Sequence, residues 1–175
     1  MTKPIKVIKP PKVIKVPKII LPKNVKVQVA CLPDEGEVIE KLFFDCLLDY
    51  SARFNAPISK ENFEVFICLI EYPEGSSTQG LTSHEMPDGT RILIQLRDPI
   101  LNDWELNMYT MDKFINILCH EIVHACQRIC KRKGITIRNL NINKKDEREV
   151  YFFDPAEMEA RLLEAPYSSL YGSNL

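Results

Sequence analysis

The chain has 175 residues, of which 45% are hydrophobic and 27% are charged, and its 23 Lys and Arg nearly balance its 24 Asp and Glu. This composition is close to that of average globular domains and excludes a wholly disordered or collagen-like chain. Lys or Pro interrupts the first thirty residues every few positions, so neither a membrane span nor a secretory leader is predicted. We therefore expect one domain with a small appendage, inside a cell, either in the cytoplasm or, in a eukaryotic or viral setting, in the nucleus.

The first 27 residues differ from the rest of the chain in charge. They contain eight lysines and no acidic residue, which gives a formal charge of +8. The rest of the chain contains the other 15 Lys and Arg and all 24 Asp and Glu, so its formal charge is −9. Six of these lysines recur at every third position: Lys3, Lys6, Lys9, Lys12, Lys15 and Lys18. The residues between them are mostly Pro, Ile and Val, which favour extended backbone over helix. The sequence predicts a disordered, extended basic arm over 1–27 and a compact domain over 28–175.

Two interpretations of this arm remain open. Its lysines suit attachment to a polyanion, such as nucleic acid, or to an anionic surface. The arm could equally be a solubilising leader, or pack on its own acidic domain. No aromatic residue is present in it to stack on bases, so sequence-specific reading of nucleic acid is not supported.

The remaining elements follow from hydrophobic periodicity. Apolar residues at three- and four-residue spacing predict an amphipathic helix over 35–54, after a short strand near 25–31. FEVFICLI and RILIQL predict strands over 63–70 and 91–96, and the polar segment 73–90 between them is long enough for a hairpin excursion or a flap. The main helix is predicted over 111–133, with Gly134 ending it, and a polar loop over 138–150 precedes a last helix from 155 to 165. Six cysteines without an export signal predict reduced, packed thiols.

The main helix contains the motif H-E-x-x-H as His120-Glu121-Ile122-Val123-His124. Residues four apart lie on one helical face, so both imidazoles can bind one metal ion, and zinc suits such ligands. Glu121 lies beside the pair, where its carboxylate can take a proton from a water that the metal activates. The alternative is a pair of core histidines bonded to backbone, although their burial in so apolar a helix is costly without a partner.

A catalytic zinc usually has three protein ligands, and no histidine follows His124. The candidates for the third ligand are the carboxylates of DPAEMEARLLEA, chiefly Glu157 and Glu159, which point about 200° apart on a helix. Asp154 and Glu157 also match a capping box, which would explain Glu157 without any metal.

HEIVHACQ followed by a helix with E-x-E-A resembles the glutamate zincins, the gluzincin-type zinc metallopeptidases, in a minimal single-domain form. SprT-like, ImmA/IrrE-like and phage or bacterial metallopeptidase domains are similar. The resemblance covers about 90–165 and implies a small α+β zincin-like domain, in which a short mixed or antiparallel sheet packs on the H-E-x-x-H helix.

The resemblance also implies a site and an activity. One Zn²⁺ would be held by His120, His124 and a later glutamate, and the family pattern favours Glu157 over Glu159. Glu121 would be the general base in endopeptidase cleavage of a protein or peptide substrate. The chain departs from the family at Arg161, where Asp or Asn usually supports a ligand histidine. The strand 91–96 is expected to be the edge strand that pairs with an extended substrate.

Two further points stay open. A donor to the transition state could come from four residues with equal claims, namely His84, Tyr151, Tyr167 and Tyr171. A rival to the enzyme is a zinc-stabilised nucleic-acid or protein binding module, whose closed metal site would use a cysteine such as Cys119 or Cys126. A further alternative is a regulatory peptidase that cuts a single protein.

Overall fold

The computed structural model describes residues 21–30, 36–71, 78–84, 90–97, 111–135 and 150–171. Its elements in chain order are β1 (Val25–Val29), α1 (Gly36–Arg53), β2 (Phe63–Ile70), β3 (Gly80–His84), β4 (Arg91–Arg97), α2 (Met111–Ile129) and α4 (Pro155–Tyr171). The α+β class is confirmed. The six arm lysines, the first residue of the helix predicted over 35–54 and most of the predicted loop over 138–150 lie outside the described residues.

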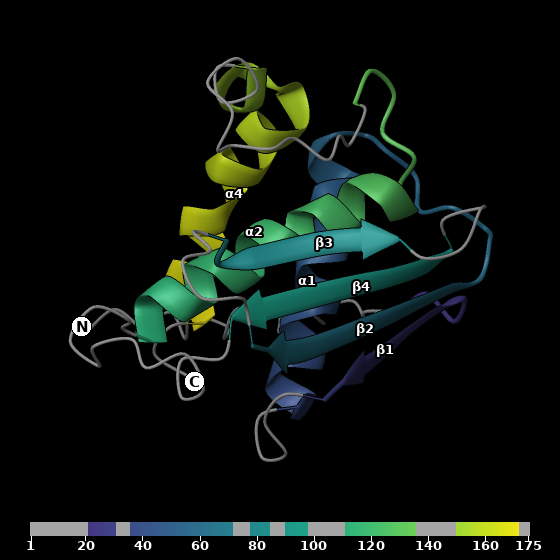
Figure 1. The fold of residues 1–175 in the computed structure, drawn as a ribbon. Helices are drawn as coiled ribbons and strands as arrows, with labels where there is room; N and C mark the ends of the chain where they lie inside the picture. Colours follow the sequence, from purple (N-terminus) through teal and green to yellow (C-terminus); the bar gives the residue numbers. More distant parts are fainter. Residues whose placement is uncertain are drawn as a thin grey trace, which may run out of the picture.

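The strands form one mixed sheet in the order β1-β2-β4-β3. β1, β2 and β4 are parallel, and β3 is antiparallel to β4. Figure 1 shows α1 and α2 on the same face of this sheet, with α4 packed against α2. Val25 and Val27 pair with Phe63 and Val65 of β2, so the short strand predicted near 25–31 is confirmed over Val25–Val29, and the described sheet begins at Val25.

The core lies between the sheet and the two helices. β2 and β4 alternate as half-buried strands do, with one face fully buried against α1 and α2. The residues that fill this layer are Phe63, Val65, Ile67, Ile92, Ile94 and Leu96 from the strands, and Leu42, Phe43, Leu47, Ile115, Leu118 and Ile122 from the helices. Each such side chain contributes about 1.5–3 kcal/mol when it leaves water, so this layer fixes α2 on the sheet.

β3 is the element that the sequence did not predict as a strand. Its composition, GLTSH, is weakly strand-forming, and its pairing with β4 from Gly80–Leu96 to His84–Ile92 is what makes it extended. The hairpin alternative for the segment 73–90 therefore fits its central part. The expectation that the strand 91–96 is an edge strand is wrong, because β4 lies between β2 and β3. Among the described strands, β3 and β1 form the edges.

α2 ends earlier than predicted. Lys131 has a positive φ of 45°, its N–H donates to the carbonyl of Arg128, and the N–H of Arg132 donates to the carbonyl of Gln127. This pair of bonds is a Schellman ending with Lys131 at C′, so the predicted helix end at 133 and the role given to Gly134 are wrong. The early ending turns the chain so that Arg132 comes back over α4.

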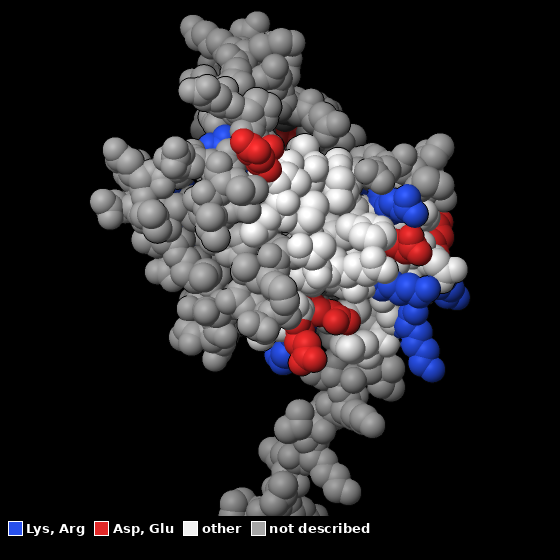
Figure 2. Space-filling view, turned by 60° about the horizontal axis from the view of Figure 1, so that its bottom comes forward, with Lys and Arg blue, Asp and Glu red and all other residues white. Residues whose placement is uncertain are grey.

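Charged side chains do not separate by sign on the face seen in Figure 2. Uncharged residues occupy its middle, and the described Lys and Arg lie next to Asp and Glu toward its margins. Ion pairs of this kind join Arg91 to Glu64 and Lys131 to Glu61. Within the described ranges, no helix is both long and apolar enough to cross a bilayer.

Candidate metal centre

α2 carries both motif histidines on the side that faces α4. The helix buries most of its surface, since Ile115, Leu118, Ile122 and Val123 are fully buried against the core. His120 and His124 are one turn apart, and their ring centroids lie 4.9 Å from each other. Both rings are thus fixed by the packing of the helix that bears them.

α4 brings a carboxylate to these rings. Its first turn is capped by Asp154, whose Oδ1 accepts a hydrogen bond from the N–H of Ala156 at 2.9 Å. The reciprocal bond of a capping box is not formed, because the N–H of Asp154 donates to the carbonyl of Tyr151 and Glu157 turns toward the histidines instead. The capping-box explanation of Glu157 is therefore wrong.

The three side chains converge on one point. His120 Nε2 lies 3.2 Å from His124 Nε2 and 3.2 Å from Glu157 Oε2, and His124 Nε2 lies 3.3 Å from Glu157 Oε1. One ligand atom from each residue can be chosen so that all lie within 4.8 Å of one another. A tetrahedral zinc with bonds of about 2.0–2.1 Å separates its ligands by about 3.3–3.4 Å. His120, His124 and Glu157 therefore form a group that could bind a metal ion.

Each histidine also has a partner at Nδ1, on the side of the ring away from the point of convergence. His120 Nδ1 lies 2.9 Å from Glu164 Oε2, and His124 Nδ1 lies 2.9 Å from Gln127 Oε1. The resemblance leads one to expect Asp or Asn at position 161 as support for a histidine, and Glu164 is the carboxylate that lies at His120 Nδ1. Arg161 instead donates to the carbonyl of Phe152, with its guanidinium 5.5 Å from the ring centre of Tyr151.

The carboxylates around the two histidines stabilise a positive charge on or between the rings. Burial lowers the pKa of His120, but the hydrogen bonds to Glu157 and Glu164 outweigh this and raise that pKa to about 9. Burial raises the pKa of Glu157, yet the bonds to His120 and His124 hold it well below its usual range. Without a metal, a proton on a histidine supplies this charge. With a metal, the ion replaces the proton.

Glu121 lies beside this group and is buried, with 7% of its surface exposed. The Thr82 hydroxyl, on β3, is 2.7 Å from Glu121 Oε2 and 2.9 Å from the Glu121 backbone carbonyl. Burial raises the pKa of Glu121, and this exceeds the opposing effect of His124, His120 and Thr82. A carboxylate with a raised pKa is suited to accept and return a proton.

Glycine at position 80 permits this close approach of strand to helix. A Cβ at Gly80 would lie 2.8 Å from Ile117 Cγ2 and 2.9 Å from both Glu121 Cγ and Glu121 Oε1. No real side chain tolerates such contacts without a shift. β3 and the general-base candidate can therefore pack together only because residue 80 has no side chain.

Glu159, the alternative third ligand, points elsewhere. Its Oε2 accepts a hydrogen bond from the Tyr50 hydroxyl at 2.6 Å, and its Oε1 lies 3.4 Å from Arg132 Nε. The structure brings Glu157 to the histidines and Glu159 to α1, in line with their opposite directions on the helix.

The four candidate donors are also separated. Tyr151 donates a hydrogen bond to Glu157, and burial together with the charge of Glu157 raises the pKa of its hydroxyl. The Tyr167 hydroxyl donates to Asp49 Oδ2 at 2.7 Å, on the side of α1. The side chains of His84 and Tyr171 lie outside the described residues. Of the two whose side chains the structure describes, Tyr151 is the one that lies at the site.

Four residues of the site were not predicted from the sequence: Gly80, Thr82, Gln127 and Glu164. Helical spacing could have indicated two of them, because Gln127 follows His124 by three residues and Glu164 follows Glu157 by two turns. Gly80 and Thr82 carried no local signal, since their position depends on strand pairing. The cysteines of the rival interpretation, Cys119 and Cys126, are buried in the core and belong to no metal-binding group among the described residues.

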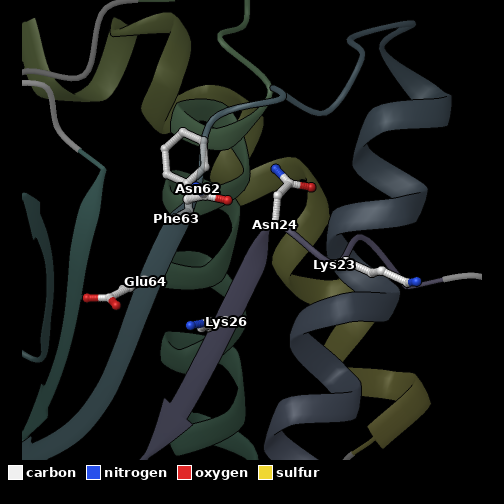
Figure 3. Close-up of a pocket in the computed structure, with 6 residues that line it drawn as sticks. All are labelled: Lys23, Asn24, Lys26, Asn62, Phe63 and Glu64. Atoms are coloured by element: carbon white, nitrogen blue, oxygen red, sulfur yellow. The ribbon is translucent and has the colours of Figure 1, made fainter.

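A separate cavity of about 290 Å³ lies where β1 and β2 begin. Figure 3 shows its lining, formed by Lys23, Asn24, Lys26, Asn62, Phe63 and Glu64. Asn24 Nδ2 already donates to the backbone carbonyls of Ser59 and Glu61. None of these residues belongs to the histidine group, so this cavity is not part of the candidate metal centre.

Comparison of the chain with family models, with curated proteins and with solved structures gave no significant match. The class that fold and site define is therefore described by geometry alone. It is an α+β domain with a two-histidine, one-carboxylate group that could bind a metal and a buried glutamate beside it.

Proposed function

We propose that this chain is a zinc-dependent endopeptidase of the glutamate zincin type. The observation that carries the proposal is the convergence of His120 Nε2, His124 Nε2 and the two oxygens of the Glu157 carboxylate, with approaches of 3.2–3.3 Å, next to the buried carboxylate of Glu121. Two imidazoles and one carboxylate leave a tetrahedral zinc with one open position, as catalytic zinc sites have. A zinc ion there supplies Lewis acidity, which acidifies a water and polarises a carbonyl.

Glu121 performs the proton transfers of the proposed reaction. Its carboxylate takes a proton from the attacking water as the water oxygen bonds to the scissile carbonyl carbon. It then returns that proton to the amide nitrogen as the C–N bond breaks, which gives a free carboxylate and a free amine. Its raised pKa and its fixed contact with Thr82 support this exchange.

The substrate would pair with β3. β3 is an edge strand among the described strands, and its residues Gly80 and Thr82 touch Glu121. An extended peptide added along this edge would pass beside the proposed general base, with main-chain hydrogen bonds that fix its register. This proposal moves the substrate from β4, where the sequence placed it, to β3.

Two features near Glu157 support a peptide substrate. Tyr151 offers a hydroxyl at the ligand group, which suits a donor to a developing oxyanion. Phe152 and Phe153, directly before α4, are 54% and 78% exposed, and Met158 on the first turn is 53% exposed. Apolar side chains of a bound peptide could pack on these residues.

Glu121→Gln tests the mechanism. The variant should bind one zinc per chain, as the wild type should, and should lose peptidase activity by at least about 10²-fold because general acid–base catalysis contributes about 10²–10⁴-fold. Zinc content by elemental analysis and cleavage of an unstructured protein are the two measurements. Full activity in Glu121→Gln would refute the mechanism.

The matched control is Glu64→Gln, the same chemical change at an exposed carboxylate of β2 that pairs with Arg91 and not with the histidines. It should keep both zinc and activity at near wild-type levels, whereas Glu157→Gln should lose zinc. A wild-type protein that binds no zinc, and whose thermal stability is unchanged by chelators, would favour a pair of core histidines. Zinc that is bound but inactive toward general proteins and peptides would favour a binding module or a peptidase for one protein.

Attachment of the arm to nucleic acid or another polyanion stays a prediction from the sequence. Six of its eight lysines lie outside the described residues, and on the face seen in Figure 2 the described Lys and Arg lie next to Asp and Glu.

A further inference from the structure

Gln127 is buried, with 2% of its surface exposed, and every polar atom of its amide has a partner. Its Nε2 donates to the carbonyl of Ala156 at 2.8 Å and lies 3.4 Å from Glu159 Oε2. Its Oε1 lies 2.9 Å from His124 Nδ1. One amide thus joins the second histidine of α2 to the residue that precedes Glu157 on α4.

These contacts fix which way the amide points. If its oxygen and nitrogen were exchanged, Oε1 would face the Ala156 carbonyl and the Glu159 carboxylate, so acceptors would meet acceptors. The NH₂ group must therefore face α4, and Oε1 must face His124. Because Oε1 can only accept, His124 Nδ1 must carry the hydrogen of this bond.

The tautomer of the His124 ring follows from the orientation of the Gln127 amide. A neutral histidine with hydrogen on Nδ1 has its lone pair on Nε2. His124 Nε2 is the nitrogen that lies 3.2 Å from His120 Nε2 and 3.3 Å from Glu157 Oε1. The amide therefore leaves the lone pair of His124 on the side where the three ligand atoms converge.

We propose that Gln127 is a positioning residue that sets the ring tautomer of His124 for metal binding and ties it to the start of α4, with Glu159 holding the amide in its orientation. The two glutamates of E-x-E then have different tasks. Glu157 faces the metal position, and Glu159 keeps the Gln127 amide from flipping. The inference deepens the proposed zinc site and depends on it only for the identity of the ion.

The test compares Gln127→Met, a nearly isosteric change without the amide, with Gln95→Met on β4, away from the site. Zinc affinity of Gln127→Met should fall about 10- to 100-fold, the usual effect of losing such an outer partner. In metal-free protein labelled with ¹⁵N-histidine, at a pH where His124 is neutral, the wild type should show hydrogen on Nδ1. Gln127→Met should show a mixture of tautomers, and Gln95→Met should match the wild type in both measurements.

Gln127→Glu provides a second variant that tests the same inference should Gln127→Met fail to fold. It keeps an acceptor toward His124 Nδ1 and removes the donor toward Ala156, so the Nδ1–H tautomer should persist while zinc affinity falls. An unchanged tautomer and an affinity within twofold of wild type in folded Gln127→Met would overturn the inference. A wild type that shows the Nδ1–H tautomer but binds no zinc would refute the proposed function and leave the role of Gln127 standing.

Discussion

At the scale of single residues, the position of Glu121 depends on the absence of a side chain at Gly80. The contacts of 2.8–2.9 Å that a Cβ would make involve Ile117 of α2, which packs against the core, and two atoms of Glu121 itself. The Glu121 carboxylate is the group with more freedom to move. Its displacement would separate it from Thr82 and from the proposed water.

Gly80→Ala should therefore impair activity more than folding. We expect at least a tenfold loss of peptidase activity with zinc retained, and a loss of about 1–3 kcal/mol in the free energy of unfolding, as for other overpacked sites. Gly36→Ala is the matched control, because a Cβ there would lie 3.9 Å from the nearest atom, Val29 Cβ. Kinetics and urea denaturation of both variants measure the effect, and equal activity of the two would contradict it.

At the scale of elements, the site is assembled by the packing of α4 on α2. Ala156, Ala160 and Leu163 of α4 are buried, and they place Glu157 and Glu164 against the histidines of α2. Two bonds to α1 fix the far side of α4, from Tyr50 to Glu159 and from Tyr167 to Asp49. The position of the ligand group thus depends on the mutual packing of α1, α2 and α4.

Leu163→Ala and Leu162→Ala test whether packing of α4, and not the loss of a leucine from the helix as such, stabilises the site. Leu163 is 1% exposed and Leu162 is 67% exposed, although they are neighbours on α4. Leu163→Ala should cost about 2–5 kcal/mol of stability and weaken zinc binding, since it loosens α4 on α2. Leu162→Ala should change stability by no more than about 0.5 kcal/mol. Thermal unfolding with and without zinc measures both, and similar losses in the two variants would contradict the packing described here.

At the scale of the whole molecule, the folded domain buries cysteine thiols and a tyrosine hydroxyl, and burial favours their protonated, uncharged forms. The described cysteines are free, and burial raises the pKa of the Cys130 thiol to about 11 and that of Cys46 well above its usual value. Burial and a hydrogen bond to Asp49 raise the pKa of Tyr167 in the same direction. In the unfolded chain these groups ionise near their ordinary values, about 8.5 for a thiol and about 10 for tyrosine.

Stability should consequently fall in alkaline solution. Above pH about 8.5 the unfolded chain binds fewer protons than the folded one, so each rise in pH favours unfolding until the folded pKa, about 11 for Cys130, is passed. The urea midpoint should be lower at pH 10 than at pH 8. Cys130→Ala should show a shallower fall over that interval, and a wild-type midpoint that is constant from pH 8 to pH 10.5 would contradict this account.

The sequence by itself determined what depends on local periodicity. The 3.6-residue repeat placed His120 and His124 on one face of α2, short apolar runs of β-type residues indicated β2 and β4, and Asp154-Pro155 marked where α4 begins. These features involve residues near one another in the chain, so their spacing is enough to predict them.

Only the tertiary structure decided which distant residues complete the site. Whether Glu157 or Glu159 faces the histidines depends on the rotation of α4 against α2, and the local pattern allowed both. β3 is a strand and β4 an interior one because of pairing across the sheet, which no local propensity of GLTSH reveals. Gly80, Thr82, Gln127 and Glu164 acquire their roles through contacts between separate elements, and such contacts are set by packing of the whole domain.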